Sequence, residues 1–142
     1  MRMTILCGLT LVLLAGCGED DEEGATRASL EGPLVYERGG GLAGRRDRLV
    51  LQPSGTAKLT VRNETREVEL KPAELDRIAA EVERIDLASL PEDSTTKPPV
   101  ADAFGYRIQY GASEITTDDP GMPDELRGLV GRLTGIVERY EP

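Results

Sequence analysis

The 142-residue chain has no histidine and no tryptophan, one phenylalanine, and two cysteines near its amino end. Without histidine it lacks the commonest general base and a principal ligand of transition metals. Cys7 and Cys17 lie in or beside an N-terminal leader and do not make a CxxC-type site. We therefore expect no enzyme activity, no resident metal and no cofactor.

Positive charge is also scarce, because 17 Lys and Arg residues face 26 Asp and Glu residues and the net charge is -9. A nucleic-acid partner requires a basic face against its phosphates, so this balance argues against one. Aromatic residues make up only 4% of the chain, so Leu, Val, Ile and Ala must fill the core. The length suits one domain behind a removable leader.

The amino end predicts a bacterial lipoprotein. Arg2 precedes an apolar run over residues 5–14, which is short for a membrane span and typical of a secretory signal. The following Leu-Ala-Gly-Cys at residues 14–17 resembles the lipobox, which implies a signal peptide over residues 1–16 and a lipidated Cys17. An ordinary signal peptide with a chance cysteine, or an uncleaved anchor, is the alternative.

Residues 17–29 predict a flexible acidic tether between Cys17 and the domain. Five consecutive acidic residues at positions 19–23 repel one another and have no apolar face to bury. About twelve residues of flexible chain reach roughly 20 Å. Because two or three acyl chains hold a protein stably to a membrane, we expect an extracytoplasmic, lipid-anchored domain on a bacterial cell membrane.

Alternating apolar residues predict strands in residues 30–142, which we expect to form the domain. Leu49 and Leu51 lie on one face of a strand, and Pro53 to Gly55 supply a turn to the next. The other predicted strands have inward positions at Ala57, Leu59 and Val61; at Val68 and Leu70; at Phe104, Tyr106, Ile108 and Tyr110; and at Ile115 and Thr117. The aromatic residues among them are expected in the core rather than on a ligand platform.

Helical spacing predicts two helices, one from Pro72 with apolar residues up to Ile85 and one from Pro123 with apolar residues up to Val137. The fold class is therefore α+β: an antiparallel sheet of about five strands with two helices packed on one face, in ββ(β)α-ββα order. Both helices open with Pro-x-Glu-Leu, which arises either from duplication of a ββα unit or from helix physics alone.

A glycine-rich segment separates two strand-like runs between residues 34 and 51. Gly39, Gly40, Gly41 and Gly44 surround a single large apolar residue, Leu42. Such glycines permit close approach of another backbone. The segment lacks the Lys-Ser/Thr ending of a P-loop, so the sequence does not predict a phosphate-binding site here. Two interpretations stay open: Leu42 is exposed for a contact, or it folds inward and the glycines make a bulge.

Two other segments, one a loop and one acidic, are weaker candidates for a functional site. Residues 91–103 have no periodicity and predict a long loop, which is either a secondary contact segment or disordered. Asp118 and Asp119 lack the regular ligand spacing of a calcium loop.

The chain resembles the emfourin family over residues 30–140. The resemblance is carried by Glu-Arg-Gly-Gly-Gly-Leu-Ala-Gly at residues 37–44, by the ββα order, by Asp-Ala-Phe-Gly-Tyr at residues 102–106 and by the Pro-x-Glu-Leu helix start. It implies a small α+β inhibitor of a thermolysin-like zinc metalloprotease. The lipoprotein leader and acidic tether depart from the family pattern.

For a thermolysin-like target, which favours a bulky apolar residue just after the scissile bond, the glycine-rich segment supplies a physical hypothesis: Leu42 is an anchor that enters the cleft between small neighbours. Arg45, Arg46 and Arg48 would then contact acidic cleft edges. The alternative is a non-catalytic envelope lipoprotein that binds another protein or has a structural role, and an enzyme is the third hypothesis. The full set of predicted contact residues is Gly39, Gly40, Gly41, Leu42, Ala43 and Gly44.

Overall fold

The computed structural model describes residues 28–141. The predicted signal peptide, Cys17 and most of the predicted tether lie outside the described residues.

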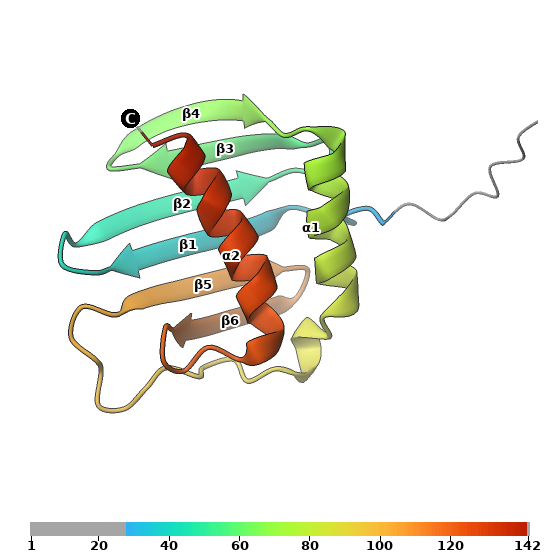
Figure 1. Cartoon of the computed structure of the whole chain (residues 1–142). Helices are drawn as coiled ribbons and strands as arrows, with labels where there is room; N and C mark the ends of the chain where they lie inside the picture. Colours follow the sequence, from blue (N-terminus) through green and yellow to red (C-terminus); the bar gives the residue numbers. More distant parts are fainter. Residues whose placement is uncertain (1–27, 142) are drawn as a thin grey trace, which may run out of the picture.

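The described residues form one antiparallel sheet of six strands in the order β4-β3-β2-β1-β5-β6 (Figure 1). The α+β class is confirmed, and the sheet has one strand more than the five or so predicted. The strand predicted at Val68 and Leu70 is β4, which ends one residue before Leu70; five of its six side chains are exposed, so its hydrophobic pattern is weak and pairing with β3 makes it a strand. The strands are β1 (Leu34–Gly40), β2 (Arg45–Leu51), β3 (Thr56–Val61), β4 (Glu64–Glu69), β5 (Phe104–Tyr110) and β6 (Ser113–Asp118).

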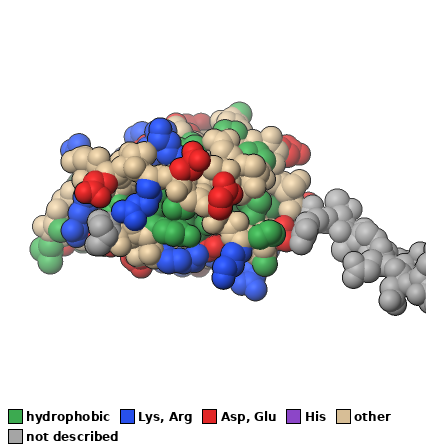
Figure 2. Space-filling model, turned by 90° about the horizontal axis from the view of Figure 1, so that it is seen from above, with side chains coloured by type: hydrophobic (Ala, Val, Ile, Leu, Met, Phe, Trp, Pro, Cys, Tyr) green, Lys and Arg blue, Asp and Glu red, His purple; other side chains and the backbone are tan. Residues whose placement is uncertain are grey.

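The free edge at β4 carries charges of both signs. Figure 2 looks onto this side of the molecule and shows Lys or Arg side chains interspersed with Asp or Glu side chains. Exposed charges on an edge strand oppose pairing with a strand of another molecule. At the other edge, Asp93 of the loop before β5 forms a bridge with Thr116 of β6.

Two helices, α1 (Pro72–Arg84) and α2 (Asp124–Arg139), cover one face of the sheet, and a short 3-10 helix, η1 (Leu87–Ser89), follows α1 (Figure 1). Pro72 occupies the first turn of α1, as predicted. Pro123 is the residue before α2 rather than its first residue, because its backbone is still extended. The predicted helices are therefore confirmed, with a one-residue shift at the second start.

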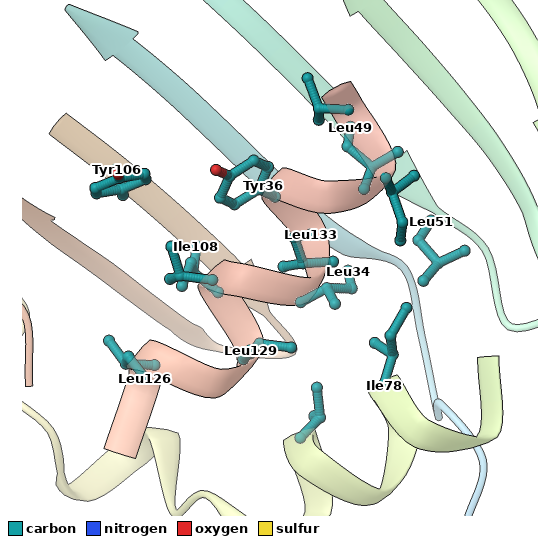
Figure 3. Packing of buried hydrophobic residues seen from close by; sticks show 14 of the residues in the cluster. Leu34, Tyr36, Leu49, Leu51, Ile78, Tyr106, Ile108, Leu126, Leu129 and Leu133 are labelled. Atoms are coloured by element: carbon teal, nitrogen blue, oxygen red, sulfur yellow. The ribbon is translucent and has the colours of Figure 1, made fainter. Parts of the chain in front are cut away.

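The core lies between the helices and the sheet. Leu126, Leu129 and Leu133 of α2 are fully buried and lie over strands β1 and β5 (Figure 3). The Tyr36 hydroxyl lies 2.7 Å from Thr134 Oγ1 of α2, and burial raises the pKa of Tyr36 to about 12. The predicted aromatic strand belongs to this core, with Tyr106 and Ile108 buried and Phe104 and Tyr110 packed against it.

Among residues 28–141, every buried hydrophobic residue falls between Leu30 and Val137. A chain that begins at residue 18 or at residue 25 therefore retains the whole core, and we expect it to fold without the leader. Among the described residues no helix covers the opposite face of the sheet, which we call the outer face. It carries the row Arg48, Glu37 and Arg107 across the paired strands β2, β1 and β5.

Candidate functional site

The glycine-rich segment is the end of the β1–β2 hairpin. A four-residue turn, 41–44, joins the strands, and the Gly44 N–H donates to the Gly41 carbonyl at 3.1 Å. The Leu42 side chain is 90% exposed, so the alternative in which it folds inward is wrong. Within residues 28–141, Leu42 and Val100 are the two exposed large hydrophobic residues.

Two glycines of this turn region are required by both backbone conformation and space. Gly40 has φ of 106°, and a Cβ there would lie 2.7 Å from the Ala103 carbonyl oxygen. Gly41 has φ of 67°, and its Cβ would lie 2.8 Å from Cζ of Phe104. Side chains rarely adopt positive φ, the Gly40 contact is with backbone, and the Gly41 contact requires the Phe104 ring to move, so substitution at either position strains the turn.

The end of the long loop lies beside this turn. The Gly41 N–H donates to the Ala103 carbonyl at 3.3 Å, and Gly40 is the register partner of Phe104. Both segments lie at the same end of the sheet, on the left in Figure 1. We call residues 39–44 and 100–103 together the tip. Sequence patterns identified both segments as candidates for contact with a partner. They contained no signal that the two segments lie against each other, which results from the pairing of β1 with β5.

Asp102 is the one carboxylate of the tip. It is exposed and has φ of 66°, which is uncommon for a residue with a side chain and often marks a functional position. In the sequence, Asp102 stands out only as part of the motif at residues 102–106 that carries the family resemblance. The backbone conformation that distinguishes it from other surface acids is visible only in the structure.

Asp118 holds the middle of the loop against the sheet. Its carboxylate accepts hydrogen bonds from the backbone N–H groups of Thr96 and Gly121 at 2.8 and 2.7 Å. Burial raises the pKa of Asp118, but these hydrogen bonds outweigh that effect and hold it below its ordinary value of 3.8. The loop is therefore attached to the sheet rather than disordered as the alternative had it.

Asp119 supports the strand that follows the loop. Its carboxylate accepts hydrogen bonds from the Phe104 N–H at 2.9 Å and from the Tyr106 hydroxyl at 2.7 Å. Burial and the neighbouring carboxylate raise the pKa of Tyr106, which stays protonated as the donor. Asp118 and Asp119 thus bind protein groups, and Asp118 is buried, whereas their composition alone is that of a solvated acidic surface.

A buried ion pair lies beneath the hairpin. Arg38 of β1 donates to Asp47 Oδ2 of β2 from Nε and Nη2, at 3.0 and 2.8 Å, and to Glu138 Oε1 of α2 from Nη1 at 3.1 Å. Arg38 and Asp47 are 4% and 3% exposed. The guanidinium also lies 5.2 Å from the ring centre of Phe104, the ring that contacts Gly41.

The three flanking arginines have different surroundings. Arg45 is largely covered and pairs with Glu141 near the end of α2. Arg48 pairs with Glu37 at 3.0 Å on the outer face. Arg46 is exposed there and forms no ion pair within the described residues, so of these three arginines it is the most available to a partner.

Within residues 28–141 no group of three or more Cys, Asp or Glu side chains is placed to hold a metal. The described part also contains no helix long and apolar enough to cross a membrane.

The sequence model of the family described as Emfourin matches residues 54–134, more than half of the chain. The chain belongs to the Emfourin family. This family consists of inhibitor domains rather than catalytic ones. The match runs from the turn before β3 into α2 and includes the Asp102 loop, whereas the hairpin with Leu42 precedes it. A search of curated proteins finds no match.

The strain at the tip is testable with two alanine substitutions. We expect Gly41→Ala to lower the free energy of unfolding by about 1–3 kcal/mol, because it combines positive φ with a contact against Phe104. The matched control is Gly39→Ala, whose Cβ would meet only the Arg45 carbonyl at 3.5 Å, and its change should stay within about 0.5 kcal/mol. Urea unfolding measures the change in the free energy of unfolding for both variants. Equal changes would contradict the requirement for glycine at position 41.

The attachment of the loop predicts an acid-dependent loss of stability. Since the pKa of Asp118 is lowered on folding, its contribution is present above the ordinary value of 3.8 and disappears as the pH falls through the lowered pKa. The parent should therefore be more stable than Asp118→Asn near neutral pH, and the difference should shrink in acid. Urea unfolding between about pH 2 and pH 7 measures it. A difference independent of pH would argue against the role of the carboxylate.

Proposed function

We propose that this Emfourin-family domain inhibits a thermolysin-like zinc metalloprotease by placing the tip in its active-site cleft. The observation that carries the proposal is the 90% exposure of Leu42 on a turn held by a hydrogen bond from Gly41 to Ala103. A side chain exposed to this extent contributes no hydrophobic burial to the domain itself. An apolar pocket of a partner gives it a place to be buried.

The turn is suited to binding without being cleaved. Gly41 and Gly44, on either side of Leu42 and Ala43, have φ of 67° and 58°, far from the extended conformation of a strand. Phe104 and the Ala103 carbonyl support the turn from the neighbouring strand. Because the turn is already ordered, it loses little conformational entropy on binding and resists adjustment towards a cleavable geometry.

Asp102 gives the tip a group that suits a zinc ion. The target class has zinc in its cleft, and a carboxylate oxygen is one of the ligands that zinc accepts. Asp102 is exposed and directly precedes Ala103, which is hydrogen-bonded to the turn that carries Leu42. We propose that Leu42 occupies an apolar subsite while Asp102 faces the zinc ion of the enzyme.

Attachment to a membrane is compatible with this placement of the tip. The described part of the chain begins near α1, at the opposite end of the strands from the tip (Figure 1). We propose that the lipid on Cys17 tethers the domain outside the cytoplasm, with the tip left free for the enzyme. The lipobox resemblance at residues 14–17 supports this part of the proposal.

Inhibition of a purified thermolysin-like protease tests the anchor residues in a chain that begins at residue 18. Leu42→Asp should weaken inhibition by about thirtyfold or more, as expected for a buried interface anchor. Asp102→Ala should weaken it by at least about tenfold, as expected when a charged interface contact is lost. The control Ala112→Asp adds the same charge in the turn between β5 and β6 at the other end of the sheet and should have no effect.

Two results would contradict the proposal: no inhibition by the parent, or equal inhibition by a folded Leu42→Asp variant. The first would favour an envelope lipoprotein that binds some other protein. Thermal unfolding of each variant checks that it is folded.

Lipid attachment is tested separately in bacterial cells that express the full chain. A labelled fatty acid should be incorporated into the parent, and incorporation should be lost in Cys17→Ser because the acceptor thiol is absent. Cys7→Ser is the matched control and should keep the label. Labelling of Cys17→Ser would overturn the lipobox assignment.

A further inference from the structure

The outer face of the sheet has a hollow of about 460 Å³ beside the tip. We call it the outer hollow. Its lining includes the backbone of β1 and β5, and Thr95 from the loop before β5. Three arginines whose side chains lie on the outer face also line it, namely Arg46, Arg48 and Arg107, beside the buried Arg38 and Asp47 of the opposite face.

A pair of glycines forms the floor of the outer hollow. Gly39 of β1 and Gly105 of β5 are direct register partners. Neither has a positive φ, and a Cβ at either position would meet backbone atoms no closer than 3.5 Å. The backbone therefore does not require glycine at these positions. Their effect is to leave the strands bare, so that an extended chain can approach closely.

The outer hollow is positively charged in a chain whose net charge is -9. The outer-face side chains that line it include three arginines and one acid, Glu37, an excess of two positive charges within the lining. Glu114 of β6 lies outside the lining and is 3.5 Å from Arg107 Nε, which reduces the excess to one when it is included. Glu37 Oε1 lies 3.0 Å from Arg48 Nε, and its Oε2 lies 3.7 Å from Arg107 Nη1. Arg46 forms no ion pair within the part of the chain that the structure describes. This arrangement complements an acidic partner.

The hollow is continuous with the tip. Arg46 pairs with Gly39, and the next pair towards the turn is Arg45 with Gly40. A protein that covers Leu42 is therefore within reach of the outer hollow. The acidic residues 19–23 of this chain are a poorer occupant, because the chain enters at the opposite end of β1 (Figure 1).

We propose that the outer hollow binds an extended acidic segment of the metalloprotease whose cleft receives Leu42. This inference rests on the proposed function and adds a second contact that favours proteases with an acidic segment near the cleft. The arginines attract that segment, and the bare glycine backbone lets it lie against the sheet.

The test compares two kinds of change in the hollow in a chain that begins at residue 18. One variant combines Arg46→Glu and Arg107→Glu. The other, Gly105→Leu, fills the floor with a side chain that points away from the core. Lys58→Glu is the matched charge control, because it lies on the same face but outside the hollow. Leu42→Asp is measured in parallel as the control for the tip.

Inhibition rates are measured against a thermolysin-like protease at about 0.01 M and about 1 M salt, where screening differs strongly. The double arginine variant should associate about tenfold more slowly at low salt, and the deficit should shrink at high salt. Gly105→Leu should weaken inhibition by about tenfold at either salt concentration, because a shape change is not screened. Lys58→Glu should match the parent.

The inference is overturned if the double arginine variant inhibits like the parent while Leu42→Asp does not inhibit, and the proposed function then stands. It is also overturned if the slower association of the double arginine variant is seen in the chain that begins at residue 18 but not in one that begins at residue 25. The acidic tether, which the shorter chain lacks, would then be the occupant of the outer hollow. A parent that does not inhibit overturns both proposals. Thermal unfolding confirms folding, and the arginine pair decides the test if Gly105→Leu does not fold.

Discussion

Strand β1 is hydrogen-bonded on both sides, to β2 and to β5, and this double pairing decides where the candidate site lies. The register places Gly40 opposite both Arg45 and Phe104. The end of the hairpin is therefore forced against the end of the long loop, which lies some sixty residues later in the chain. Any shift of register by one residue would turn the buried face of β1 towards solvent, so burial of Leu34 and Tyr36 protects the geometry of the tip.

The buried pair of Arg38 and Asp47 strengthens this constraint at the end nearest the tip. Taking two charges out of water is costly, and such a pair is acceptable only when hydrogen bonds satisfy most of its polar atoms. Here the Arg38 guanidinium bridges β2 and α2 and lies over Phe104 of β5. An apolar pair would fill the same space but would not select one register or one position of α2. We infer that the charges serve to specify the position of the hairpin.

The two faces of the sheet have separate roles in this interpretation. The helices and one face make the core, and because aromatic residues are few, leucine and isoleucine fill most of it around Tyr36 and Tyr106. The outer face and the tip remain available to a partner. Membership of the Emfourin family, whose domains are inhibitors, agrees with a binding role for these surfaces.

The sequence alone determined the class of the fold and most of its elements. Period-two and helical spacing identified the strands around Leu49, Leu59 and Ile108 and both helices, because burial of one face imposes those periods directly on the chain. The bounds of the edge strand β4 and the first residue of α2 were harder to predict from the sequence, because exposed positions and helix caps leave little hydrophobic pattern. Four glycines around Leu42 identified a special segment, but not whether its leucine is exposed.

The tertiary structure alone decided what surrounds that segment. Pairing of β1 with β5 brings Asp102 beside the turn, and it aligns Gly39 with Gly105 to open the outer hollow. These contacts join residues far apart in the chain, and no local period or propensity records them. They depend on which strands become neighbours, a choice made by the packing of the whole sheet against its two helices.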